Sequence, residues 1–443
     1  MYDLAIIGAG WAGFNAAQRA KELGLKVCLI ESGLIGGTCL NYGCIPTKAL
    51  IASAKIFEQT KKSSDFGIEL DNLSLNFTKI QEKKNKIVWD LAQGMKAKLS
   101  GIDFIQSLAL INSSQEIKVN DGLINCKFIL IASGSRPQEL EELKFNGSTT
   151  LTINPEQGRK IDQEKIISSD DILNLSEIPK SLLIVGGGVI GCEFASLFSS
   201  LGSKVTLIEK MPHLLMGEDR EIVRKIEVIF KKKGIQVVTG AAVANFNLEE
   251  YSRVLVCVGR TANTQGLGLE KLGIKLENHK IIVDAYLKTS LANIYAAGDC
   301  TAKIMLAHYA AYQGKLAVEN MFLDNKQTAD NKIIPACIFT SPQIASVGLN
   351  QESAQAAGFA IKIHKIDFRA NAMAHIMGEA DGFIKIISKQ DNQEIVGASI
   401  IGPQATELIS ILSVAISARL SVNQIRAMIF AHPSLSELIH EAL

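Results

Sequence analysis

Apolar runs and helical stretches follow each other in a pattern that occurs twice along the chain. Residues Ile6–Glu31 and Ile184–Glu209 each contain an apolar run, a glycine-rich turn, a stretch with helical spacing, a second apolar run and a final glutamate, at an offset of 178 residues. Apolar runs that alternate with helices in this way predict parallel strands joined by crossover helices. The duplication therefore predicts two doubly wound α/β domains in one chain.

The turn of each repeat has the spacing GxGxxG. In dinucleotide-binding units the first glycine makes a tight turn, the second lets a pyrophosphate approach the backbone, and the third permits close packing of helix on strand. A glutamate lies 23 residues after the first glycine in both copies, where it can accept hydrogen bonds from ribose hydroxyls. Glycine turns without a ligand are the weaker alternative, so we predict two Rossmann-like sites, at Gly8, Gly10, Gly13 and Glu31 and at Gly186, Gly188, Gly191 and Glu209.

Two dinucleotides in one chain indicate a flavin that passes electrons to a nicotinamide. Glu209 favours NAD over NADP, because a carboxylate at this position repels a 2′-phosphate. Two later apolar runs, 126–137 and 251–263, would close the two nucleotide domains. A third run ends at Asp299, where an acid after a buried strand can bind a cofactor hydroxyl. From about Asn331 the pattern changes to that of an antiparallel sheet with helices.

Composition and charge exclude several other classes of protein. The 443 residues carry a formal net charge of +1, and 47% are hydrophobic and 21% charged, which argues against nucleic acid or an anionic membrane as the main partner. No apolar run approaches the roughly 20 residues of a membrane helix. Because the chain begins directly with a strand-like run, we expect no signal or transit peptide and a cytoplasmic location.

Two of the eight cysteines, Cys39 and Cys44, lie five positions apart. Five residues of a continuous α-helix rise about 7.5 Å, so a disulfide, with its limit of roughly 7 Å between Cα atoms, would need a distorted backbone. Gly43 can supply unusual dihedral angles, and Pro46 removes a donor. A strained, accessible disulfide is easily reduced, so we favour a redox pair. Unpaired thiols or half of a zinc site are the alternatives, but the other cysteines are scattered singly, so we expect no metal.

Taken together, these motifs resemble those of a known family. GGTCLNYGCIPTK (36–48), both glycine fingerprints, IYAAGD, MLAHYAAYQG and AHPSLSE occur in the order found in flavoprotein disulfide reductases, and the closest resemblance is to the dihydrolipoamide dehydrogenases. The resemblance covers nearly the whole chain. It implies FAD in the first nucleotide site, NAD in the second, and a homodimer.

The resemblance also implies roles for residues at the redox pair. Cys39 would exchange with a dithiol substrate, and Cys44 would lie against the flavin and pass electrons to it. Lys48 would lie near the flavin N5 and pair with Glu193.

The resemblance assigns the base to His432, contributed by the partner subunit and oriented by Glu437. Thiol exchange by itself also requires a base with a pKa of about 7 and a carboxylate that holds its imidazole, although a turn histidine is the alternative. Asp299 would bind the ribityl chain of FAD. The other residues expected at the cofactors are Gly37, Thr38, Ser133, Gly134, Gly298 and Ala307 for FAD, and Gly259 and Arg260 for NAD.

We therefore expect an α/β protein with two Rossmann-like domains and a C-terminal α+β domain. The FAD-binding domain would span 1–147 and the NAD-binding domain 148–265. Residues 266–330 would return to complete the FAD or central domain, and 331–443 would form the dimerisation domain.

The leading hypothesis for function is oxidation of a dihydrolipoyl dithiol through the cysteine pair and FAD, with hydride passed to NAD. The partner would be a lipoyl-carrying domain, on another chain, of a 2-oxoacid dehydrogenase or glycine-cleavage complex. Glutathione-reductase-like and mercuric-reductase-like activities, and a non-catalytic flavoprotein subunit, are the alternatives. Gln18 stands where glutathione reductases carry an arginine, and no cysteine follows Cys337 as mercuric reductases require. Trp11 and Tyr42 stand where smaller residues are usual, and would narrow the substrate channel.

Overall fold

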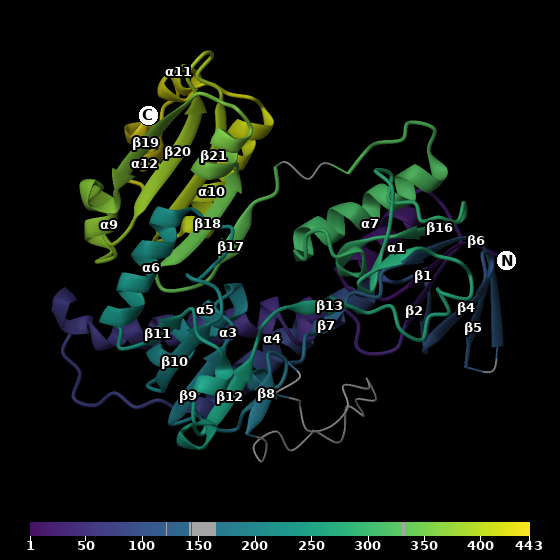
Figure 1. Cartoon of the computed structure of the whole chain (residues 1–443), viewed down its shortest axis with the longest axis horizontal. Coiled ribbons are helices and arrows are strands. Elements are labelled where there is room, and N and C mark those ends of the chain that lie inside the picture. Colours follow the sequence, from purple (N-terminus) through teal and green to yellow (C-terminus); the bar gives the residue numbers. More distant parts are fainter. Residues whose placement is uncertain (121, 141–142, 144–164, 330–332) are drawn as a thin grey trace. The chain divides into compact units, whose positions relative to one another are not determined.

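The computed structural model describes residues 1–120, 122–140, 143, 165–329 and 333–443 (Figure 1). The chain folds into two compact units. Unit 1 comprises residues 1–53, 72–177 and 255–329, and unit 2 comprises residues 54–71, 178–254 and 330–443. The expected domain boundaries at 147/148 and 330/331 lie outside the described residues. None of the described helices is long and apolar enough to cross a bilayer.

Unit 1 is built on a seven-stranded sheet in the order β3-β2-β1-β6-β5-β4, with β16 paired to β6. Strand β1 is parallel to β2 and β6, and Ile6 lies between Leu29 and Leu130. Most of β1 and β2 and the last three residues of β6 are buried on both faces, which is why these stretches are apolar rather than alternating. The strands are β1 Tyr2–Ile7, β2 Val27–Glu31, β3 Asp103–Gln106, β4 Ala109–Ser113, β5 Glu116–Val119, β6 Gly122–Ile131 and β16 Ile294–Ala296.

Helices α1 and α7 lie side by side in unit 1 (Figure 1). Helix α1 starts directly after the first glycine fingerprint. A Cβ atom at Gly13 would lie 1.8 Å from the carbonyl oxygen of Gly8, so only glycine lets the helix lie this close to the turn. The helices that begin in this unit are α1 Trp11–Glu22, α2 Gly37–Asn41, α3 Cys44–Lys61, α4 Phe77–Lys98 and α7 Ala307–Phe322, and α3 passes into unit 2 at Ala54.

Short strands complete unit 1. Strand β7 (Ser135–Pro137) pairs antiparallel with β13 (Arg260–Ala262), so residues far apart in sequence meet after the end of β6. Strands β14 (Leu276–Glu277) and β15 (Lys280–Ile281) form a small hairpin. Strand β8 (Ile166–Ser168) pairs with β12 (Arg253–Val256) as the outer strand of a five-stranded sheet.

The second repeat forms a parallel sheet in unit 2. Strand β10 lies between β9 and β11 and is parallel to both, and β12 follows β9. The α5 helix packs on β9 and β10 and is almost wholly buried, which agrees with its apolar sequence. The elements are β9 Ser181–Val185, α5 Val189–Ser200, β10 Lys204–Glu209, α6 Arg220–Lys232, β11 Gln236–Thr239 and β12 Arg253–Val256, and the border between the units falls within β12.

The C-terminal part of unit 2 is a five-stranded antiparallel sheet in the order β17-β18-β21-β20-β19. Helix α10 packs on β18 and β21, and α12 packs on β19 and β20 (Figure 1). The predicted fold class, two Rossmann-like domains with a C-terminal α+β domain, is confirmed. The elements are β17 Ala336–Ile338, β18 Gln343–Gly348, α8 Gln351–Ala356, β19 Ile361–Asp367, α9 Ala372–Ile376, β20 Phe383–Lys389, β21 Ile395–Gly402, α10 Ala405–Ser417, α11 Val422–Arg426 and α12 Glu437–Ala442.

A buried ion cluster joins the sheet of this C-terminal part to α6. The Nζ atom of Lys385 on β20 lies 2.8 Å from a carboxylate oxygen of Asp219 and 2.8 Å from one of Glu221. The side chains of Lys385 and Asp219 are only 2% and 3% exposed. Asp219 also caps α6, because its carboxylate accepts a hydrogen bond from the Glu221 amide at 2.9 Å.

We expect the substitution Lys385→Met to lower the free energy of unfolding by about 3–5 kcal/mol, because it leaves the Asp219 carboxylate buried without its cation. Lys365→Met is the matched control. Lys365 also pairs with Glu221, but its side chain is 37% exposed, so its loss should cost less than about 1 kcal/mol. Urea unfolding followed by circular dichroism measures both values. Equal effects of the two substitutions would contradict a dominant role for the buried pair.

Candidate active site

The first fingerprint has the geometry that a dinucleotide requires. Gly8 has a φ of 103°, in the region that favours glycine, and Gly10 forms the N-cap of α1 without a capping side chain. The amide groups of the first turn of α1 are therefore available to phosphate oxygens. The carboxylate of Glu31 accepts hydrogen bonds from the amides of Ala9 and Gly33, at 2.6 and 2.7 Å. These residues fit the adenosine pyrophosphate of FAD.

The second fingerprint repeats this geometry in unit 2. Gly186 has a φ of 114°, and Gly188 forms the N-cap of α5, again without a capping side chain. Glu209 accepts hydrogen bonds from the amides of Gly187 and Met211, at 2.6 and 2.7 Å. Because the two carboxylates are held in the same way, they are placed to act alike toward a ribose. The residues fit a second dinucleotide.

Other residues expected at FAD cluster beyond the ends of β6 and β16. Asp299 follows β16, and one of its carboxylate oxygens accepts a hydrogen bond from the Ser135 hydroxyl at 2.6 Å. The Ser133 hydroxyl donates to the carbonyl oxygen of Asn263, and Gly134 has a φ of 73°. Gly37 and Thr38 open α2, Ala307 opens α7, and the Gly298 amide donates to Gln313 Oε1 at 2.8 Å.

Arg260, expected at NAD, has a guanidinium group that contacts residues of unit 1. Its Nε donates to the Ser135 hydroxyl at 2.8 Å, and Nη2 donates to the Ser135 carbonyl at 2.9 Å. Nη1 lies 3.7 Å from Asp170, and Gly259 has a φ of 136°. The side chain therefore fixes β7 beside Asp299, and a role of Gly259 and Arg260 toward NAD stays a prediction.

Ser135 is the residue of this cluster that the sequence analysis missed. Ser135 contacts both Asp299 and Arg260, so it links segment 72–177 of unit 1 to segment 255–329. Its neighbours Ser133 and Gly134 were expected at FAD, and the continuation of the same SGSRP segment is the signal that could have found it.

The redox pair lies where two helices meet end to end. Cys39 is the third residue of α2, Cys44 is the first residue of α3, and Tyr42 and Gly43 lie between the helices. Both cysteines are thiols in the structure. The break between the helices supplies the non-helical backbone that a bond between Cys39 and Cys44 would need.

The expectation that Gly43 supplies an unusual dihedral angle is wrong. Gly43 is absent from the residues with positive φ, so it adopts no left-handed conformation. Instead, a Cβ atom at this position would lie 3.1 Å from the carbonyl oxygen of Thr38. The glycine therefore eases the close approach of the α2 backbone. The Thr47 hydroxyl further fixes the link by donating to the Gly43 carbonyl at 2.6 Å.

The Cys39 thiol lies in surroundings that disfavour its ionisation. The hydrogen bond to the Cys44 sulfur raises the pKa of the Cys39 thiol, and burial raises it further, whereas Trp11 and the charge of Lys48 lower it. The net effect is a raised pKa of the Cys39 thiol. Cys44 is also the first residue of an 18-residue helix, whose N-terminal dipole stabilises a thiolate. Cys39 consequently needs a base before it can act as a nucleophile.

Lys48 and Glu193 belong to different units. Lys48 lies in the first turns of α3, in unit 1, where its charge acts on Cys39. Glu193 is a buried residue of α5, in unit 2, and its carboxylate accepts a hydrogen bond from the Phe339 amide at 2.9 Å. Their expected pairing stays a prediction.

His432 and Glu437 form a hydrogen-bonded pair in unit 2. His432 Nδ1 lies 2.8 Å from Glu437 Oε1, and the Ser434 amide donates to Glu437 Oε2 at 2.7 Å. The Ser434 amide and then His432 hold the pKa of the Glu437 carboxyl below its usual value. The imidazole is 74% exposed, and Glu437 contacts Nδ1, so Nε2 is accessible to a group from outside this loop. The pair has the geometry of an oriented base.

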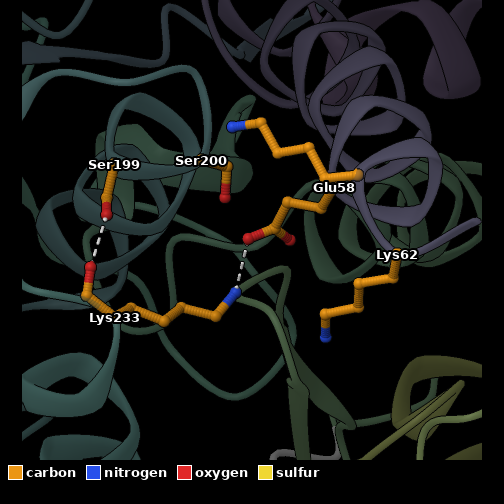
Figure 2. A pocket seen from close by; sticks show the side chains of 6 residues that line it. Glu58, Lys62, Ser199, Ser200 and Lys233 are labelled. Carbon is orange, nitrogen blue, oxygen red and sulfur yellow. Dashed lines mark hydrogen bonds and ion pairs between the residues drawn. The ribbon is translucent and has the colours of Figure 1, made fainter. Parts of the chain in front are cut away.

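A separate pocket of about 190 Å³ lies in unit 2 (Figure 2). Figure 2 shows the Lys233 amine directed at the carboxylate of Glu58, 2.8 Å away. None of the expected site residues lines this pocket, so it is not the candidate active site. Its lining residues are Glu58, Lys61, Lys62, Ser199, Ser200 and Lys233.

Family models and curated relatives match the chain over nearly its whole length. Residues 2–314 match the model "pyridine nucleotide-disulphide oxidoreductase", and residues 334–443 match the dimerisation domain of the same group. The chain is 38% identical to dihydrolipoyl dehydrogenase of Chlamydia trachomatis, across 100% of this chain and 96% of the relative. It is 37% identical to a dihydrolipoyl dehydrogenase of Bacillus subtilis, across 100% and 97%.

Solved structures of the same group are also similar. The HOCl-induced flavoprotein disulfide reductase RclA from Escherichia coli is 29% identical, with a TM-score of 0.86 and coverage of 100% of this chain and 99% of that one. LpdA from Mycobacterium tuberculosis is 26% identical, with a TM-score of 0.88 and coverage of 99% and 98%.

Proposed function

The chain belongs to the pyridine nucleotide-disulphide oxidoreductase family, and from this premise we propose that it oxidises protein-bound dihydrolipoyl groups with NAD as the final acceptor. It is a flavoprotein disulfide oxidoreductase that uses FAD and NAD, as the sequence motifs predicted, and its C-terminal domain is the family's dimerisation domain. When bound, FAD accepts two electrons from the cysteine pair and delivers them as hydride to NAD.

The arrangement of the cysteine pair carries this proposal. Cys44 lies at the N-terminus of α3, whose dipole favours a thiolate, while the pKa of the Cys39 thiol on α2 is raised. In the disulfide form, a substrate thiolate attacks Cys39 Sγ, and the electron pair of the broken S–S bond moves to Cys44. The second substrate thiol then displaces Cys39 to form the lipoyl disulfide, and its proton goes to a base. Two electrons have then moved from the dithiol to the cysteine pair.

His432 supplies the base in this proposal, and Glu437 holds its ring. The enzyme works as a homodimer in the cytoplasm, with the lipoyl group carried by a domain of a 2-oxoacid dehydrogenase or glycine-cleavage complex on another chain. Lys48 pairs with Glu193 beside the flavin. The proposal also keeps the predicted domains, 1–147 for FAD, 148–265 for NAD, 266–330 for the return segment and 331–443 for dimerisation.

A comparison of two assays on the purified holoenzyme tests the function. We expect the rate of NAD reduction by dihydrolipoamide to exceed the rate of NADPH oxidation by glutathione disulfide by on the order of 100-fold or more. The substrate site should favour dihydrolipoamide over glutathione disulfide, and the Glu209 carboxylate should repel the 2′-phosphate of NADPH. Cys39→Ser, which should retain FAD, is the control and should abolish dithiol oxidation. Faster reduction of glutathione disulfide by NADPH would overturn the proposal.

A further inference from the structure

Trp11 is the first residue of α1, and its side chain contacts Cys39, the proposed exchange cysteine. It directly follows the N-cap residue Gly10, and α2, which carries Cys39, begins in contact with the same turn. A Cβ atom at Gly37 would lie 2.9 Å from Gly10 Cα, so the two helix starts touch through their backbones. All of these residues belong to unit 1.

The indole N–H of Trp11 is buried and makes no full hydrogen bond within the described part of the chain. The polar group that its side chain contacts is the Cys39 thiol, and this contact lowers the pKa of that thiol. A neutral thiol is a weak acceptor, whereas a thiolate is a strong one. A buried donor without a partner is costly, and ionisation of Cys39 would remove that cost.

We propose that the indole N–H of Trp11 donates a hydrogen bond to Cys39 Sγ when that sulfur carries negative charge. This role rests on the proposed function, in which Cys39 leaves as a thiolate when the second substrate thiol forms the lipoyl disulfide. The S–S bond between substrate and Cys39 breaks in this step, the electron pair moves to Cys39 Sγ, and Trp11 stabilises the charge that develops there. Trp11 is then a catalytic residue rather than only a wall of the substrate channel.

The other groups that act on Cys39 both lie on α3. The Cys44 sulfur opposes ionisation of Cys39, and the Lys48 charge favours it. Because Cys39 and Cys44 titrate as a pair, a measurement on Cys39 alone needs Cys44 removed. The titration is therefore carried out in a Cys44→Ser background, with FAD bound.

The test is the pH dependence of iodoacetamide alkylation at Cys39, with the modified residue identified by peptide mass. Trp11→Phe keeps an aromatic ring but lacks the N–H, so we expect the alkylation pKa of Cys39 to rise and the rate below that pKa to fall about tenfold. Trp89→Phe is the matched control. Trp89, the other tryptophan, is 62% exposed on α4, and its replacement should leave the profile unchanged.

A second variant separates loss of the N–H from a change of shape. Benzothienylalanine has the shape of tryptophan with sulfur in place of N–H, and a Trp89→Phe background confines it to position 11. It should reproduce the profile of Trp11→Phe. An unchanged profile in both variants, with only the KM for dihydrolipoamide altered when the same substitutions are made with Cys44 present, would overturn the proposal and leave Trp11 as a wall of the channel. Failure of Cys39 to be alkylated in any variant would instead count against its proposed exchange role.

Discussion

Replacing His432 with glutamine should lower the kcat for NAD reduction by dihydrolipoamide by about 10²–10⁴-fold, the usual contribution of a general base. The physical reason is the proton of the substrate thiol. In the proposed reaction each thiol of the substrate must lose its proton before it attacks sulfur, so the exchange requires proton transfer to an oriented base. Glu437 holds Nδ1 of the ring at 2.8 Å, and glutamine cannot take up the proton.

Two controls separate the loss of the base from damage to the fold. Electron transfer from NADH to a small artificial acceptor bypasses the disulfide, so the variant should retain this activity. His375→Gln makes the same substitution at an exposed histidine of α9 and should leave both activities unchanged. A loss of less than about tenfold for His432→Gln would remove the histidine from the role of base.

Mixing two inactive variants should restore activity if the site is shared between subunits. His432→Ala keeps its cysteine pair, and Cys44→Ser keeps its histidine. After an equal mixture is unfolded and refolded, about half of the dimers should be mixed if subunits assort at random across a two-fold interface. Each mixed dimer has one site with both groups intact and one site with neither. The mixture should therefore recover about a quarter of the wild-type activity per site, far above either variant alone.

The control for this experiment is the proof that mixed dimers form, by native mass spectrometry of one isotope-labelled variant. If His432 instead served the cysteines of its own chain, every site in every dimer would stay defective. Mixed dimers that remain inactive would therefore rule out the shared site.

The repeated fingerprint was the part of the fold most open to prediction. Its elements are local, because a turn, a helix and a second strand follow within 26 residues of Ile6, and their period and glycines are visible in the sequence. The contacts of Glu31 and Glu209 were less predictable. Each carboxylate accepts an amide hydrogen bond from the turn of its own fingerprint, 22 residues earlier in the chain, and that contact exists only after both strands have paired.

The errors and omissions at the site have the same cause. The sequence predicts an unusual dihedral angle at Gly43, whereas in the structure this glycine eases a close approach to Thr38, which only the assembled turn reveals. Arg260 carries no sequence signal for its contacts with Ser135, 125 residues away. Local sequence thus predicted candidate residues from motifs, but the partner of each side chain depends on segments that meet only in the folded protein.

The pairing of β16 with β6 has a consequence for the order in which the protein is made. Ile294, Tyr295 and Ala296 pair with Ile129, Leu130 and Ile131, so the sheet of unit 1 lacks its seventh strand until translation has passed residue 296. The parallel sheet of unit 2 has by then been complete since the synthesis of β12 at Val256. The sheet of the first repeat therefore begins first on the ribosome but is completed after the sheet of the second repeat.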